Sequence, residues 1–371
     1  MEIQVERRTL FKRLDQNLIL VILALHLVGL INLFSATHSA GSIDIDRTFL
    51  NQCIWVALGW TSFFVMTFVD YQTISRLSIP FYIFNIASLA YVSAFGHISL
   101  GAQRWINFGF FKFQPSETAK LSIIFILSTI LARKSQPNGL DFKDLLVPIG
   151  VTILPFALTV TQPDLGTAMM LALIAGSLIY FVKVRLRVLV TVVALISVTL
   201  PIAWNFALRD YQKNRVLTFL DPGRDPRGAG YNSIQSRIAV GSGRVLGKGF
   251  RQGTQSQLEF LPERHTDFIY SVLSEEHGFV GSLTTVVLFI LLLVLALRIA
   301  TQAKNKLGTL LAVGTAAMVF WHFCINIGMV IGILPIVGIP LPLLSYGGSS
   351  MLSTMTALGI LSNISLKKYL F

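Results

Sequence analysis

Charged side chains are scarce in this chain of 371 residues. Only 13% of its residues are Asp, Glu, Lys or Arg, against roughly 25% in an average soluble domain. Cysteine is rarer still: the chain has two, Cys53 and Cys324. Both fall in apolar runs, and nothing in the sequence pairs them. The scarcity of charge argues against a soluble globular protein, and the two cysteines are expected to be small apolar fillers.

Several soluble-protein signals are also absent. No Pro- or Ser-rich linker separates a soluble module, and no nucleophile elbow is present. The stretch GSGRVLGKG spaces its glycines wrongly for a dinucleotide fingerprint, and Lys248 is followed by Gly249 rather than by the Ser or Thr of a phosphate-binding loop. Both nucleotide-binding interpretations therefore fail, while a Ser-His-Asp triad stays open without a nucleophile elbow to support it.

Long apolar runs dominate what is present. The chain is 53% hydrophobic, its mean hydropathy is +0.68, and it contains runs of the 17 to 25 residues that a membrane-spanning helix needs. Ten such runs are centred near residues 26, 59, 88, 125, 152, 173, 197, 289, 321 and 354. The sequence predicts an all-α polytopic membrane protein of about ten helices, with residues 1–371 forming a single membrane domain.

The distribution of Lys and Arg predicts the orientation. These residues gather before the first run and in every second short connection after it, which marks those parts as cytoplasmic. Both termini are then cytoplasmic, and residues 207–277, between runs 7 and 8, form a long extracytoplasmic loop with partly helical or interfacial segments. Much of the net charge of +12 is this cytoplasmic signal, but ten basic residues of the loop need a local explanation: Arg209, Lys213, Arg215, Arg224, Arg227, Arg237, Arg244, Lys248, Arg251 and Arg264.

Four segments that open to the outward side hold most of the ionisable groups that lie near membrane depth, where such groups are functional candidates. In residues 101–120, Pro115 and Ser116 predict a helix start with Ser116 as a possible N-cap. Glu117 and Lys120 then share one helical face. They either stabilise helix packing as an internal ion pair or line a cavity, and the sequence leaves both interpretations open.

Two further outward segments have competing explanations. Asp164, in TQPDLGT, suits the N-cap of the sixth run, and that structural role outweighs a cavity role. In PLPLLSYGGSS, backbone amides near a helix start could cradle an anion, whereas close helix packing by small residues explains the same composition equally well. The residues concerned are Ser345, Gly347, Gly348, Ser349 and Ser350.

The long loop ends in ERHTDF, where Asp267 stands directly before an apolar run. Glu263 and His265 occupy alternate positions before it, but no further ligands complete a zinc site. A helix cap is the plain structural role for Asp267. The alternative is a lone carboxylate in an outward cavity among arginines and lysines, which suits a base for an acceptor hydroxyl beside cations for a phosphate leaving group.

These residues resemble a known family. GAQRWI, QPSETAK, QPDLGT, NRVLTFLDP, GTQSQLEFLPERHTDF and PLPLLSYGGSS follow, in order, the pattern of the SEDS proteins (shape, elongation, division and sporulation), from the first apolar run to the last. LPERHTDFI and the short N-terminus are more similar to the elongation branch, RodA, than to the division branch. His277, in SEEHG, departs from the apolar residue expected there.

The resemblance implies a peptidoglycan glycosyltransferase that polymerises lipid II into β-1,4 glycan strands for cell elongation and rod shape. It implies inverting transfer from an undecaprenyl-diphosphate donor, at the extracytoplasmic face of the bacterial cytoplasmic (inner) membrane. The family's catalytic residue corresponds to Asp267 in this sequence, and its charge pair in the cavity corresponds to Glu117 and Lys120. Substrate-binding or cavity roles are expected for Arg104, Gln114, Ser116, Asp164, Arg215, Ser345, Gly347, Gly348 and Ser349.

The resemblance also implies partners, namely a class B penicillin-binding protein as separate transpeptidase and other elongation-complex proteins. Nucleic acid is not expected, and neither is an organic cofactor. A divalent cation such as Mg²⁺ could share the charge of the leaving group, although no ligand set is legible. A flippase for a lipid-linked precursor, or a non-catalytic cell-wall scaffold, are the alternative functions; the flippase has no clear internal repeat to support it.

Overall fold

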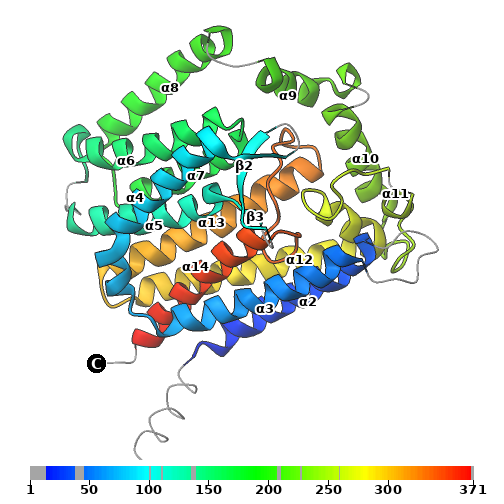
Figure 1. Ribbon diagram of the computed structural model, residues 1–371, viewed down its shortest axis with the longest axis horizontal. Helices are drawn as coiled ribbons and strands as arrows, with labels where there is room; N and C mark the ends of the chain where they lie inside the picture. Colours follow the sequence, from blue (N-terminus) through cyan, green and yellow to red (C-terminus); the bar gives the residue numbers. More distant parts are fainter. Residues whose placement is uncertain are drawn as a thin grey trace, which may run out of the picture.

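The computed structural model describes residues 14–37, 46–99, 102–109, 112–134, 139–206, 210–225, 228–258 and 260–368. Long helices make up most of it (Figure 1). The first seven are α2 (Gln16–Thr37), α3 (Arg47–Phe68), α4 (Tyr71–Phe95), α5 (Pro115–Lys134), α6 (Phe142–Thr161), α7 (Leu165–Phe181) and α8 (Leu186–Phe206). The last three are α12 (Ile269–Gln302), α13 (Lys306–Val330) and α14 (Gly348–Lys367).

Each of the ten predicted apolar runs has its centre inside one of these ten helices. Eight of them are long and apolar enough to cross a membrane, among the residues described. The other two are α7, which has 17 residues, and the less apolar α14, which has 20. The chain is a multi-pass helical membrane protein, and the count of ten crossings stays a prediction.

Two prolines inside α6 show how a helix in an apolar environment keeps its backbone satisfied. A proline has no N–H, so the carbonyl four residues earlier loses its helical partner. The Asp144 carbonyl, freed by Pro148, accepts from Lys134 Nζ at 3.2 Å. The Val151 carbonyl, freed by Pro155, accepts from the Tyr82 hydroxyl at 2.9 Å. Neighbouring helices thus supply the donors that lipid cannot.

The centre of the bundle is formed by α5 and α13. Helix α5 packs against α4, α6, α7, α13 and α14, and α13 also contacts α7, α12 and α14. Most side chains of α5 are buried, including Ser116, Ser122, Ser128 and Thr129, as expected where helices pack closely in a membrane. Helix α8 differs, because nearly all of its described residues are exposed, and it lies at the periphery in Figure 1.

A small antiparallel sheet stands between α4 and α5, so the all-α prediction missed one feature. Its strands are β1 (His97–Ser99), β2 (Ala102–Asn107) and β3 (Lys112–Phe113), in the order β1-β2-β3. The alternation in AQRWIN is too short to stand out beside long apolar runs. Strand β2 carries Arg104, one of the expected site residues.

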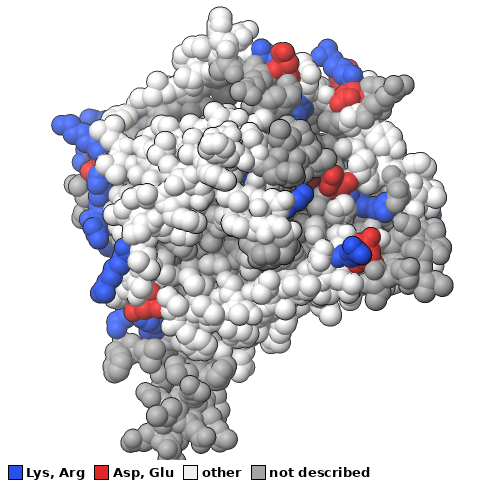
Figure 2. Space-filling model, viewed as in Figure 1, with Lys and Arg blue, Asp and Glu red and all other residues white. Residues whose placement is uncertain are grey.

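The predicted loop of residues 207–277 is largely helical where described. It contains α9 (Asp210–Leu220), the short 3-10 helix η1 (Pro222–Arg224), α10 (Ala229–Ser242) and α11 (Thr254–Gln257), while Arg209 and Arg227 lie outside the described residues. Helices α9 and α10 form an arch beside the bundle (Figure 1). Figure 2 shows mixed charges at this end and mainly Lys and Arg at the opposite edge. That division is the one expected of two membrane faces.

Helix α12 begins at Ile269, inside the predicted loop, and breaks at Gly278. Gly278 has φ 62° and ψ −157°, a conformation open almost only to glycine. The turn of residues 243–249 inserts at the break and satisfies the backbone there: Phe279 N–H donates to the Arg244 carbonyl at 2.8 Å and Lys248 N–H to the Glu275 carbonyl at 3.0 Å. The outward loop is therefore joined to the helix by backbone pairing.

A buried carboxylate completes this joint. Glu275 is fully buried, and its Oε1 accepts from Lys248 Nζ at 2.6 Å, from Thr254 Oγ1 at 3.1 Å and from Gln255 N at 3.1 Å. His277 stands directly before the break, with its ring 6.5 Å from that of Phe250. The corner that departs from the family pattern is thus a contact between the helix break and the outward loop.

We predict that Gly278→Ala destabilises the protein. A Cβ at this position would lie 2.3 Å from the Gly247 nitrogen and 2.6 Å from the Val245 carbonyl oxygen, and the backbone conformation alone costs about 1–3 kcal/mol for other residues. Thermal unfolding of the purified protein in detergent should shift to lower temperature. The matched control is Gly176→Ala in α7, where a Cβ meets nothing within 4 Å and stability should hold or rise. Equal midpoints for the two variants would contradict the role of the break.

Candidate active site

Asp267 lies in the short segment between the outward loop and α12. The residue is partly exposed, but protein surrounds its carboxyl group, and a Cβ on Gly338 would lie 3.1 Å from Oδ2. This burial raises the pKa of Asp267 to about 7; the negative charges of Glu263 and Asp164 act in the same direction, and the positive charges of Arg215 and Arg104 oppose it. The structure therefore brings Asp267, Asp164, Arg104 and Arg215 within electrostatic range of one another.

The backbone around Asp267 is held by side chains from distant parts of the chain. Asn32 Nδ2 of α2 donates to the Ile269 carbonyl at 2.8 Å. Ser345 Oγ donates to the Thr266 carbonyl at 2.7 Å. A segment that would otherwise be an exposed connection is thereby fixed against the bundle.

Arg104 and Asp164 meet at the start of α7. Asp164 caps this helix, accepting from Thr167 N at 3.2 Å and Thr167 Oγ1 at 2.9 Å, as the structural interpretation predicted. Its carboxylate also lies 3.9 Å from Arg104 NH1 and 3.3 Å from Gln114 Nε2. Arg104 additionally donates to the backbone carbonyls of Gln162 and Pro163. Asp164 therefore both caps α7 and contacts Arg104 and Gln114.

Arg215 comes from α9, on the arch. Its guanidinium group donates to the Val337 carbonyl at 3.2 Å, one residue from the glycine beside the Asp267 carboxyl group. The loop arginine is thus anchored next to the segment beside the candidate base, while its expected role toward a lipid-linked diphosphate stays a prediction.

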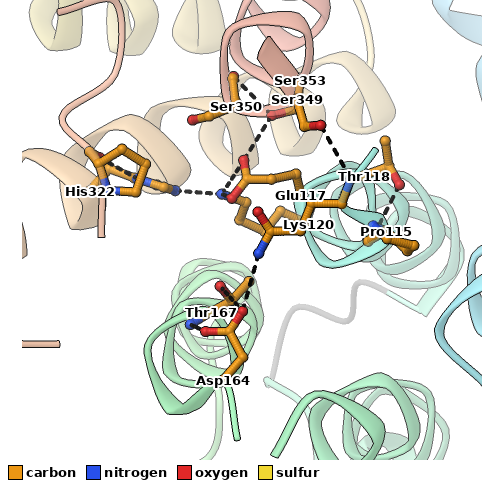
Figure 3. A network of polar contacts seen from close by, with 12 residues as sticks. Pro115, Glu117, Thr118, Lys120, Asp164, Thr167, His322, Ser349, Ser350 and Ser353 are labelled. Atoms are coloured by element: carbon orange, nitrogen blue, oxygen red, sulfur yellow. Dashed lines mark hydrogen bonds and ion pairs between the residues drawn. The ribbon is translucent and has the colours of Figure 1, made fainter. Parts of the chain in front are cut away.

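Glu117 and Lys120 form a buried ion pair. Lys120 Nζ is 2.8 Å from both carboxylate oxygens of Glu117. Lys120 is only 1% exposed and Glu117 only 4%. Lys120 also lies 2.8 Å from His322 Nε2, and Ser353 Oγ is 3.3 Å from Glu117 Oε2. Figure 3 shows α5, α7, α13 and α14 converging on this network.

Ser116 is not the N-cap of α5. The helix begins one residue earlier, at Pro115, because proline suits the first helical position, where its missing N–H costs nothing. Gln114 takes the capping position, and its carbonyl accepts from Glu117 N at 3.1 Å. Ser116 Oγ is buried and has no hydrogen-bond partner among the described residues.

The glycine- and serine-rich segment favours the packing explanation. Gly347 N donates to Gln52 Oε1 at 3.2 Å, and Ser345 O accepts from Gln52 Nε2 at 3.1 Å. Ser349 Oγ accepts from Gln114 N at 3.2 Å. Gly348 lies so close to Trp55 that a Cβ would be 2.3 Å from its ring. These groups join α3, α5 and α14 rather than leave an open row of amides.

The described residues contain no group of three or more His, Cys, Asp and Glu side chains placed to hold a metal ion. Glu263, His265 and Asp267 therefore do not converge as a zinc site. The side chains of the described residues do not form a complete cation site of their own.

Sequence reasoning missed two residues, His322 and Asn326 of α13. Both are buried in the middle of the bundle, where polar side chains are candidates for function. Their position in WHFCINIG, four residues apart in an apolar run, was an available signal.

Fold and site together define a multi-pass helical membrane protein that holds a partly enclosed carboxylate among arginines near the outward loop.

The chain belongs to the FtsW/RodA/SpoVE family, described as cell cycle proteins, whose model matches residues 15–370. It is 41% identical over 351 residues to the peptidoglycan glycosyltransferase MrdB of Escherichia coli K12, covering 95% of this chain and 93% of MrdB. It is 36% identical over 371 residues to stage V sporulation protein E of Bacillus subtilis, covering 95% of this chain and 98% of that protein.

Solved structures agree. A chain from the structure "Structural coordination of polymerization and crosslinking by a peptidoglycan synthase complex" matches with TM-score 0.82 and 28% identity, covering 96% of this chain and 98% of its own. The rod shape determining protein RodA of Thermus thermophilus matches with TM-score 0.71 and 26% identity, with the same coverage. The family resemblance drawn from the motifs is confirmed.

We predict that Glu117 and Lys120 act as a coupled pair. Removing one partner leaves the other charge buried and unpaired, which costs about 3–5 kcal/mol. Glu117→Ala and Lys120→Ala should each lower stability and activity strongly, and the double variant should lose less than the two single losses combined. Thermal unfolding and turnover of the four proteins measure this. Additive losses would show that the pair does not interact.

Proposed function

We propose that this chain is a peptidoglycan glycosyltransferase that polymerises lipid II into β-1,4 glycan strands, with Asp267 as general base. The observation that carries the proposal is the enclosed carboxyl group of Asp267. Its pKa is raised to about 7, and it lies within electrostatic range of Arg215 and Arg104. A general base works best when its pKa is near the working pH. The activity in the names of the relatives supports the reaction class.

The reaction needs one base and one stabilised leaving group. The 4-hydroxyl oxygen of the acceptor sugar attacks C1 of the donor sugar, and its proton passes to the Asp267 carboxylate. The bond between C1 and the phosphate oxygen breaks, and its electron pair leaves with undecaprenyl diphosphate. A single displacement inverts the α-linked donor to a β-linked product, in partial analogy to inverting sugar hydrolysis, so a second catalytic carboxylate is not required.

Cationic side chains would stabilise the leaving diphosphate. Arg104 and Arg215 are the arginines that act on Asp267 electrostatically, and guanidinium groups bind phosphate oxygens in a paired geometry. A divalent cation such as Mg²⁺ would supply further charge at the diphosphate when bound. Arg215 and Arg104 hold the donor so that its C1 faces the acceptor hydroxyl.

The cellular setting follows from the same proposal. The reaction takes place at the extracytoplasmic face of the bacterial cytoplasmic membrane, because Asp267 directly precedes α12 at the end of the loop predicted to lie outside, and Arg215 belongs to α9 of the same loop. A class B penicillin-binding protein would crosslink the strands, in line with the synthase complex that couples polymerisation to crosslinking and contains a relative of this chain. Within the family, the similarity to MrdB and RodA favours elongation and rod shape.

We predict that Asp267→Asn lowers polymerisation about a hundred- to ten-thousand-fold, the usual contribution of a general base. Purified protein, with its transpeptidase partner, would be given labelled lipid II. In the wild type, activity should fall as pH drops through about 7, because the carboxylate that accepts the proton becomes protonated. Normal thermal unfolding of the Asn variant is the control for folding. Polymerisation by that variant within threefold of wild type would remove Asp267 from this role.

We predict a graded loss at Arg215. A charge-assisted hydrogen bond contributes about 1.5–3 kcal/mol, so Arg215→Ala should slow polymerisation roughly ten- to hundredfold, and Arg215→Lys by less, since lysine keeps the charge but not the fork. Arg224→Ala is the matched control, because the Arg224 side chain is 58% exposed and pairs only loosely with Asp221 at 3.6 Å. Equal rates for Arg215→Ala and Arg224→Ala would exclude Arg215 as a ligand of the diphosphate.

A further inference from the structure

Helix α13 presents two buried polar side chains to the segment that connects α13 to α14. His322 is 3% exposed and Asn326 is not exposed. Residues four apart lie on the same face of a helix, and these two meet successive carbonyl groups: His322 Nδ1 is 3.1 Å from Pro340 O, and Asn326 Nδ2 is 2.8 Å from Ile339 O. One face of α13 therefore holds the connecting segment at two adjacent points.

Asn326 also reaches the candidate base. Its Nδ2 donates to the Asp267 carbonyl at 2.9 Å as well as to the Ile339 carbonyl at 2.8 Å. Carbonyl oxygens only accept, so the amide nitrogen rather than the oxygen must face both of them. One amide group thus ties the backbone of Asp267 to the segment that carries Gly338, the residue beside the Asp267 carboxyl group.

His322 extends the same connection to the buried ion pair. Because Pro340 O only accepts, the His322 proton is on Nδ1, and Nε2 is left with a lone pair that accepts from Lys120 Nζ at 2.8 Å. An ammonium group has three N–H donors, and the remaining ones meet Glu117 Oε1 and Oε2, each at 2.8 Å. The imidazole therefore links the lysine to the connecting segment in one defined tautomer. Figure 3 shows the contact between His322 and Lys120.

We propose that His322 and Asn326 are positioning residues: together they fix the backbone of Asp267 relative to the Glu117–Lys120 pair, through the carbonyls of Pro340 and Ile339. This inference rests on the proposed function of Asp267 as general base. Hydrogen bonds run from Glu117 through Lys120 and His322 to Pro340, and from Ile339 through Asn326 to Asp267, so the two halves of the site share one support.

The support matters because a base must stay within hydrogen-bonding reach of the acceptor hydroxyl. A displacement of about 1 Å can cost roughly a hundredfold in rate. Without Asn326, both the Asp267 backbone and the neighbouring segment at Gly338 lose a fixed point, and water gains access to the carboxyl group. The pKa of Asp267 then falls from about 7 toward its ordinary value. The charged neighbours Glu263, Asp164, Arg215 and Arg104 stay the same, so the loss of burial causes the change.

The first test compares Asn326→Leu, which keeps a similar volume but has no donor, with Trp321→Phe. The control residue neighbours His322 on α13 and loses a hydrogen bond of 2.9 Å to Ser177 of α7, away from the site. Hydrogen exchange of residues 260–269 should be faster in Asn326→Leu only. Its polymerisation of lipid II should fall ten- to hundredfold, with the midpoint of the pH profile below that of wild type, while Trp321→Phe matches wild type in all three measurements.

The second test separates the two ring nitrogens of His322. Asparagine can place an N–H close to the position of Nδ1, so His322→Asn should retain part of the protection of residues 335–345 and part of the rate, whereas His322→Leu should lose both. Unchanged exchange of residues 260–269 in Asn326→Leu, or equal losses in His322→Asn and His322→Leu, would overturn the positioning role. Because exchange requires no turnover, a wild-type protein that makes no polymer would contradict the proposed function, while the exchange result would still decide whether these two side chains hold the Asp267 backbone.

Discussion

An ammonium group inside a bundle of apolar helices must find every partner within the protein, and Lys120 meets this requirement at the centre of the fold. Its three donors engage Glu117 on its own helix and His322 on α13, while Ser353 of α14 contacts the same carboxylate. The cost of an unpaired charge in this place is several kcal/mol. The helices α5, α13 and α14 must therefore pack so that Lys120 keeps its partners. An apolar core of the same shape would not impose this requirement.

The same condition governs the backbone. Where α6 contains prolines, a lysine and a tyrosine from other helices serve the freed carbonyls. Where α12 breaks, the turn of residues 243–249 does so. Irregular backbone is tolerated at membrane depth only when protein supplies the missing partners, and each irregularity here therefore marks a place where two distant segments must meet. The Asp267 segment is another such place, since side chains from α2, α13 and the Ser345 region hold its carbonyls.

The helices could be predicted from the sequence because hydropathy is a local property: every predicted centre falls in a helix. The cap at Asp164 and the Glu117–Lys120 pair were also predictable, since each depends on residues three positions apart. The tie between Asn326 and Asp267 was not, because it joins residues 59 positions apart. Lys120 and His322 are 202 positions apart. Such contacts are decided by how helices pack. The helix break at Gly278 likewise depends on a turn from another part of the chain, residues 243–249.

The joint at Gly278 has a consequence for the folding of the protein. The buried Glu275 carboxylate is paired by Lys248, Thr254 and Gln255, and the backbone on both sides of the break is completed by the preceding turn. The first turns of α12, before the break, therefore depend on residues 243–255 for their polar partners. The joint therefore forms only once the turn of residues 243–249 has folded back onto α12, so this corner is completed after two separate segments of the chain have met.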